Sequence, residues 1–109
     1  MDFRDLFRHL AARPTMFLPD LRYNTYVAFV EGCNSATEGV LLEGFGDWVH
    51  ARILGVQTSF HWSAVVASPY LSHRLDESWQ HSPKVDEFDA AASAELLAQL
   101  DAFLADRST

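Results

Sequence analysis

The C-terminal stretch "FDAAASAELLAQLDAFLADR", residues 88–107, constrains the fold more than any other part of the sequence. Alanine and leucine, two of the strongest helix formers, dominate it. Its large apolar residues recur at intervals of three and four, which puts them on one face of a helix: Leu96, Leu97, Leu100, Phe103 and Leu104. Asp89 or Ser93 is a suitable N-cap. A helix of this length needs other elements to cover its apolar face.

Four segments upstream also follow a helical pattern. Residues 2–12 begin with Asp2 as a cap and show the clearest spacing, with Phe3, Leu6, Phe7 and Leu10 on one face. The others are a stretch that starts after Asp20, residues 38–54, and residues 59–68 with Ser59 as a cap. The last of these is also compatible with a strand, but no neighbouring segment reads as a pairing strand. We therefore predict an all-α chain, residues 1–109 forming a single compact bundle of about five helices.

The connection between the first two helices is unusually apolar. It reads "RPTMFLPD", residues 13–20, and prolines at both ends restrict the backbone. Such a segment is poor material for a solvated loop. We expect Met16, Phe17 and Leu18 to point back and close the end of the bundle.

The charge of the chain narrows the choice of partners. Asp and Glu number 15 against 8 Lys and Arg, which gives a net charge of −7. Such a chain is repelled by nucleic-acid phosphates, whereas a basic protein would be attracted to it. Cys33 is the single cysteine, which fits a reducing compartment. Without an apolar leader or a membrane-length apolar stretch, we expect a cytoplasmic protein with no membrane contact.

Motifs for catalysis or metal binding are hard to find. No two of the five histidines have the sequence spacing that is typical of metal ligands. They are His9, His50, His61, His73 and His81. The nearest approach to a ligand cluster is "HRLDESWQH", residues 73–81, which reads more simply as a solvated polar loop. Cys33 lies on the apolar stripe of the second helix, where a buried thiol is expected. We predict neither enzyme activity nor a metal or cofactor.

An acidic segment with aromatic residues is the best candidate for a binding surface. The stretch "DESWQHSPKVDEFD", residues 76–89, contains five acids and a single lysine. Acids can steer a basic partner while an aromatic side chain anchors it. The candidate partner-binding residues are Asp76, Glu77, Trp79, Asp86, Glu87 and Asp89. Trp79 and Phe88 could equally fold inward and join the core.

The layout of the chain resembles that of a known class of small acidic proteins. The "RPTMFLP" opening is followed by "YVAFVEGC", then by "LLEGFGDWVHARILG", and a leucine-rich helix ends the chain. The matching residues are Arg13, Pro14, Met16, Phe17, Leu18, Gly32, Phe45, Trp48, Val49 and Gly55. In these respects the chain is similar to bacterial immunity proteins encoded beside secreted toxins. The resemblance implies that it binds and neutralises a cognate toxin, a protein with a basic face.

A different class of function is also compatible with the composition. Aromatic residues make up 13% of the chain. Those of the central segments could line a pocket in a small ligand-binding or regulatory module, or they could simply form the core. They are Tyr26, Phe45, Trp48 and Trp62.

Overall fold

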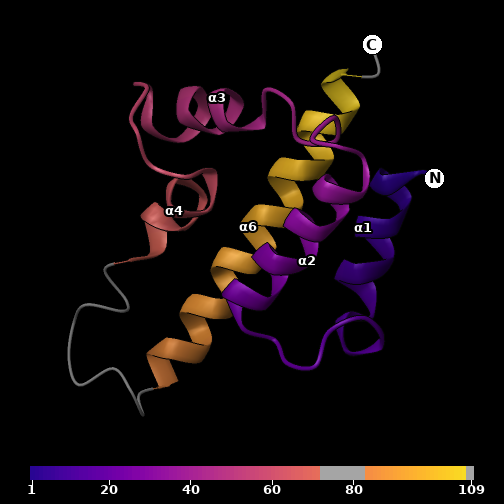
Figure 1. The fold of residues 1–109 in the computed structure, drawn as a ribbon. Helices are drawn as coiled ribbons and strands as arrows, with labels where there is room; N and C mark the ends of the chain where they lie inside the picture. Colours follow the sequence, from indigo (N-terminus) through magenta and orange to yellow (C-terminus); the bar gives the residue numbers. More distant parts are fainter. Residues whose placement is uncertain (72–82, 108–109) are drawn as a thin grey trace.

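The computed structural model describes residues 1–71 and 83–107, with side chains for residues 1–71 and 86–107. Helix α6 (Pro83–Arg107) is the longest element and runs through the middle of the molecule (Figure 1). It begins five residues earlier than the sequence pattern predicts. Its buried side chains are Phe88, Ala92, Ser93, Leu96, Leu100 and Phe103.

The other helices flank α6 on two sides. α1 (Phe3–Ala12) and α2 (Tyr23–Ala36) lie on one side, and α3 (Phe45–Val49) and α4 (Trp62–Ala67) lie on the other (Figure 1). The part of the chain that the structure describes contains five α-helices and no strand. The predicted all-α bundle is therefore confirmed, and the segment that was compatible with a strand is α4.

The first helix forms as its sequence predicts. The side chain of Asp2 accepts a hydrogen bond from the backbone N–H of Asp5 at 3.1 Å, which caps α1. Phe7 and Leu10 are buried at the centre of its apolar face. The helix ends at Ala12, because Pro14 disfavours helical geometry at the residue before it.

The segment after α1 is only partly turned inward. It forms a short 3₁₀ helix, η1 (Pro14–Met16), and Leu18 is buried as expected. Phe17 packs edge-on against Phe29 of α2, with ring centroids 6.1 Å apart. Met16 is 70% exposed, so the prediction that it closes the bundle is wrong. None of the three side chains of η1 is buried, and the chain turns inward only at Leu18.

The predicted helix over residues 38–54 is wrong as a continuous element. α2 instead continues to Ala36, and a turn follows in which Glu38, Gly39 and Gly44 have positive φ. Left-handed backbone of this kind interrupts a helix. α3 then covers five residues, and a π-helical turn, η2 (His50–Leu54), continues it.

Side chains close the turn between α2 and α3. The amide oxygen of Asn34 accepts a hydrogen bond from the backbone N–H of Leu42, and the hydroxyl of Thr37 accepts one from Leu41, both at 2.9 Å. From the far end of the chain, Arg107 donates to the carbonyls of Leu41 at 2.6 Å and Val40 at 3.0 Å. This connection is therefore tied to the C-terminal end of α6.

Two expected caps are also corrected. His61, and not Ser59, caps α4: its ring accepts a hydrogen bond from the backbone N–H of Ser63. α4 then passes into a 3₁₀ turn, η3 (Ser68–Tyr70). Neither Asp89 nor Ser93 caps α6, because both lie inside the helix, where Ser93 is buried.

Candidate functional site

The structure separates the acids of the predicted binding segment. Asp86 and Glu87 are exposed near the start of α6 and are available to a partner. Asp89 is half-buried, and its carboxylate accepts a hydrogen bond from the backbone N–H of Tyr23 at 2.9 Å. Asp89 thus stabilises the start of α2. The remaining predicted residues, Asp76, Glu77 and Trp79, lie outside the described residues.

Phe88 belongs to the core. Its ring is 3% exposed and packs edge-on against Tyr23, with ring centroids 6.1 Å apart. The hydroxyl of Tyr23 donates to the carbonyl of Ser63 at 2.6 Å, and burial raises the pKa of this phenol. Phe88 is therefore not an exposed anchor.

The aromatic residues of the proposed ligand pocket pack against one another. The ring of Phe45 is fully buried, 5.5 Å from that of Trp62 and 5.2 Å from that of Phe103 between centroids. Trp48 packs on the other side of Phe103, at 5.6 Å. Tyr26 is buried as well. These side chains fill the core, which weighs against the ligand-binding alternative.

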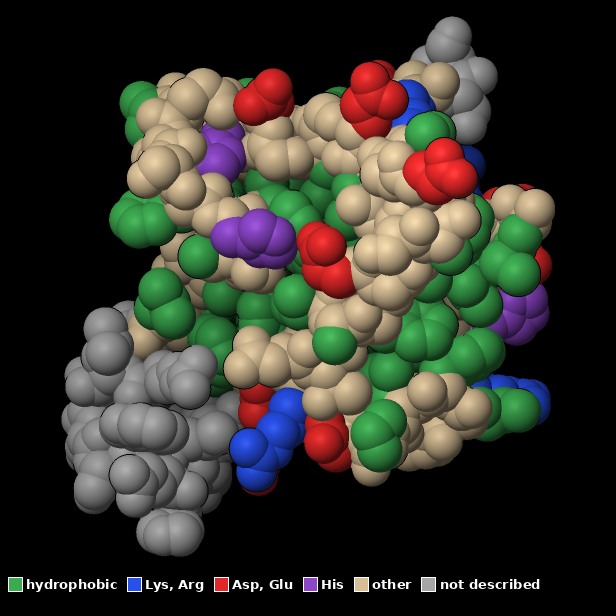
Figure 2. Space-filling model, viewed as in Figure 1, with side chains coloured by type: hydrophobic (Ala, Val, Ile, Leu, Met, Phe, Trp, Pro, Cys, Tyr) green, Lys and Arg blue, Asp and Glu red, His purple; other side chains and the backbone are tan. Residues whose placement is uncertain are grey.

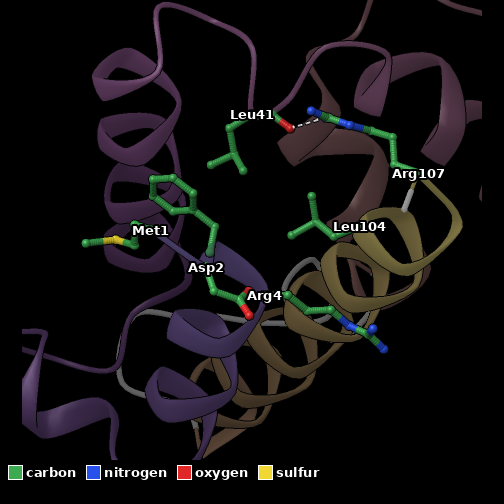
Figure 3. A pocket seen from close by; sticks show the side chains of 7 residues that line it. Met1, Asp2, Arg4, Leu41, Leu104 and Arg107 are labelled. Carbon is green, nitrogen blue, oxygen red and sulfur yellow. Dashed lines mark hydrogen bonds between the residues drawn. The ribbon is translucent and has the colours of Figure 1, made fainter. Parts of the chain in front are cut away.

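A shallow cavity of about 230 Å³ lies where the two ends of the chain meet (Figure 3). Its lining comes from the start of α1, the end of α6 and the turn before α3: Met1, Asp2, Phe3, Arg4, Leu41, Leu104 and Arg107. Both arginines are already engaged. Arg4 Nε donates to Asp101 Oδ1 at 2.8 Å, and Arg107 holds the carbonyl of Leu41. The cavity therefore offers no uncommitted guanidinium to an anion.

Other cations are engaged too. Arg8 forms a second ion pair with Asp101 at 3.3 Å, and the hydrogen bond from Arg4 lowers the pKa of that carboxyl. Arg52 lies over the ring of Trp48, 4.9 Å from its centroid, and donates to Gln99. Two arginines, Arg13 at the end of α1 and Arg22 at the start of α2, form no ion pair within the described residues.

A group of acids at the other end of α2 lacks such compensation. Glu38 and Glu43 project from the turn after α2, and Asp47 projects from α3. All three are exposed, and none forms an ion pair with any residue that the structure describes. Figure 2 shows acidic side chains along the upper rim of this face, over α3 and the connection before it. We call Glu38, Glu43 and Asp47 the upper acidic rim.

Exposed apolar side chains lie in the loop that follows η2. Phe60 is 64% exposed and Val56 is 62% exposed, while Leu54 at the end of η2 is 37% exposed. We call Leu54, Val56 and Phe60 the apolar loop. Sequence reasoning missed both this loop and the upper acidic rim. The available signal for the loop was the pattern "LGVQTSF", in which Gly55, Gln57, Thr58 and Ser59 separate its three apolar residues.

At the start of α4, Ser63 and His61 line up with Glu31 of α2. The ring Nδ1 of His61 lies 2.8 Å from the hydroxyl of Ser63, and its Nε2 lies 3.5 Å from the carboxylate of Glu31. The backbone N–H of Ser63 also donates to Nδ1, at 3.2 Å. The carboxylate of Glu31 accepts a further hydrogen bond from the indole of Trp62 at 2.8 Å. This arrangement caps α4 and ties it to α2, which accounts for each of its contacts.

The described residues contain no group of three His, Cys, Asp or Glu side chains placed to hold a metal ion. The nearest approach to a ligand cluster in the sequence, with His73, Asp76, Glu77 and His81, lies outside them. Cys33 is half-buried, and burial raises its pKa, which keeps the thiol protonated at neutral pH. None of the described helices is both long enough and apolar enough to cross a membrane.

Comparison of the chain with protein-family models, with curated proteins and with solved structures gives no match. The candidate function therefore depends on the surface itself: the upper acidic rim, the apolar loop beside it, and the exposed acids Asp86 and Glu87 at the start of α6.

Proposed function

We propose that this protein is an immunity-type inhibitor that binds a basic cognate toxin and blocks it. The observation that supports the proposal is that exposed acids on one part of the surface form no ion pair with any described residue. The upper acidic rim has no ion-pair partner among the described residues, whereas Arg4 and Arg8 share Asp101. The three carboxylates of the rim therefore remain open to a basic partner, and the cation beside the turn, Arg107, is held on the backbone carbonyls of Val40 and Leu41.

An acidic surface suits this role for a physical reason. Toxins that act on nucleic acid need a basic face for the phosphates of their substrate. An inhibitor with a complementary field finds such a face quickly, because opposite charges raise the association rate. Once bound, it covers the substrate site, and no catalytic group of its own is required.

Two acidic surfaces are available, and they differ in their surroundings. Asp86 and Glu87 are the exposed members of the segment that the sequence predicts. The upper acidic rim is joined by side-chain hydrogen bonds to α2 and α6, through Asn34 and Arg107. A surface fixed in this way loses little conformational freedom on binding. We therefore assign the main contact to the upper acidic rim.

The test is binding to the product of the open reading frame beside this gene, measured at low and moderate salt. The triple variant Glu38→Gln/Glu43→Gln/Asp47→Asn removes the rim charges, and Asp86→Asn/Glu87→Gln is its matched control. We expect tight, salt-sensitive binding by the natural chain and a lower association rate for the triple variant. If Asp86→Asn/Glu87→Gln lowers the association rate more than the triple variant does, the contact lies at the start of α6. If the natural chain does not bind at either salt concentration, the proposed function is rejected.

A further inference from the structure

We infer that the apolar loop of Leu54, Val56 and Phe60 is the hydrophobic centre of the interface with the basic partner. This inference rests on the proposed function. Val56 and Phe60 expose more than half of their surface, and neither contributes to the core. Large apolar side chains that cluster on a surface, next to polar groups, are typical of protein–protein contacts.

The backbone around the loop is fixed before any partner arrives. The π-helical turn η2 ends at Gly55, whose φ is +74° and whose N–H donates to the carbonyl of His50 at 2.8 Å. A residue with a side chain rarely adopts this φ, so the glycine sets the direction in which the loop leaves the helix. π-Helical turns are rare and often occur at functional sites.

A buried histidine holds the far side of the loop. His50 is 4% exposed, with Nδ1 2.8 Å from the carbonyl of Gly46 and Nε2 2.7 Å from the hydroxyl of Thr58. The carbonyl can only accept, so Nδ1 carries the hydrogen. The hydroxyl of Thr58 also accepts from the backbone N–H of Phe60 at 3.1 Å. His50 thus connects α3 to the residue that presents Phe60.

This bracing matters for affinity. A loop that is ordered only on binding loses conformational entropy at that moment, and the loss weakens the complex. Here the hydrogen bonds of His50 and Thr58 have already fixed the backbone of Phe60. The backbone that carries the exposed ring of Phe60 is therefore held in place, which lowers the entropy lost when the ring binds as an anchor.

The charges around the loop favour one occupant, because two acids adjoin it and the nearby cation, Arg52, is engaged with Trp48 and Gln99. Asp47, from the upper acidic rim, adjoins it, because the amide of Gln57 donates to the carbonyl of Asp47 at 3.5 Å. Glu31 lies on another side, 3.5 Å from the ring of His61, the residue after Phe60. A second copy of this chain would bring the same acids and a net charge of −7. The fitting partner is a protein with an apolar pocket bordered by lysine or arginine.

A second exposed apolar group provides a matched control. Met16 is 70% exposed and Leu21 is 50% exposed. In the sequence Leu21 lies between Asp20 and Arg22, and Arg13 lies three residues before Met16, so the acids beside this group are matched by cations. A basic partner is therefore not expected to bind there, although the apolar side chains are of similar size.

The experiment compares Val56→Ser/Phe60→Ser with Met16→Ser/Leu21→Ser for binding to the product of the adjacent open reading frame. We expect the first variant to weaken binding about tenfold or more, mainly through faster dissociation, and the second to leave it unchanged. The salt dependence of binding should stay the same in both, because no charge is altered. Unfolding curves check that both variants fold.

The outcomes separate this inference from the function on which it rests. If the natural chain binds and Val56→Ser/Phe60→Ser binds equally well, the inference is wrong and the proposed function stands. If the natural chain does not bind, both are rejected. If size-exclusion chromatography with light scattering shows a dimer that Phe60→Ser dissociates, the loop binds a second copy and the inference is wrong.

Discussion

The carboxylate of Asp89 accepts a hydrogen bond from the backbone N–H of Tyr23 at 2.9 Å, although the two residues are 66 positions apart. The first N–H groups of a helix have no partner within that helix. α6 therefore supplies the cap that the sequence before α2 lacks, and Asp20 supports the same turn by accepting from the N–H of Arg22 at 3.0 Å.

Removing this long-range cap should destabilise the protein. We expect Asp89→Ala to lower the free energy of unfolding by about 1 kcal/mol, as loss of a helix cap does elsewhere. Asp89→Asn keeps an acceptor oxygen and should cost less. Urea titration measures both, with exposed Asp86→Ala as a control that should stay within about 0.5 kcal/mol. Equal effects for Asp86→Ala and Asp89→Ala would show that the hydrogen bond contributes nothing.

Loss of the buried imidazole should loosen the apolar loop. His50→Ala removes two hydrogen bonds of the imidazole, to the carbonyl of Gly46 and the hydroxyl of Thr58, and we expect a cost of about 1–3 kcal/mol. Amide hydrogen exchange at Phe60 should become faster under native conditions. His9→Ala, on the exposed side of α1, is the control. Unchanged exchange at Phe60 would contradict the bracing role of His50.

The centre of the core should be far more sensitive than the apolar loop. Phe45 is fully buried between Trp62 and Phe103, and Phe45→Ala should cost about 3–5 kcal/mol. Phe60→Ala removes the same ring from a site that is 64% exposed, and it should cost less than about 0.5 kcal/mol. Thermal and chemical unfolding compare the two. Similar losses would mean that Phe60 belongs to the core.

The contact between α1 and α6 should depend on pH. The hydrogen bond from Arg4 holds the pKa of Asp101 below its usual value. In the unfolded chain this carboxyl has a pKa of about 3.9. The stabilisation is therefore complete above that pH and is lost as the pH falls through the lower pKa of the folded state. Asp101→Asn should be less stable than the natural chain at pH 7. The two should converge at low pH, and a constant difference down to pH 2 would exclude this origin.

Local patterns predicted several elements correctly. Asp2 caps α1, and Phe7 and Leu10 are buried on the face that their spacing indicates. The leucines of the last helix behave in the same way, with Leu96 and Leu100 fully buried. These features depend on residues three or four positions apart, so a single sequence contains the information that fixes them.

The turn between α2 and α3 contains two glycines that argue against a continuous helix. Gly39 and Gly44 both occupy left-handed backbone, and both lie within the first part of the predicted helix over residues 38–54. The apolar residues Leu41 and Leu42 fit the spacing of a helix, and both are buried. Burial of a short apolar pair does not require a helix when side chains such as Asn34 hold the backbone.

The sequence by itself determined the helical class, the acidic charge and the positions of the most regular helices, because composition and short-range spacing act locally. Only the tertiary structure decided which acidic and apolar side chains remained exposed on the surface. The carboxylate of Asp89 accepts a hydrogen bond from the N–H of Tyr23, and Phe88 is buried against the same residue. Phe60 and Val56 stayed exposed on a loop that buried His50 ties to α3 through Thr58. These outcomes depend on residues distant in the chain, whose meeting is set by packing.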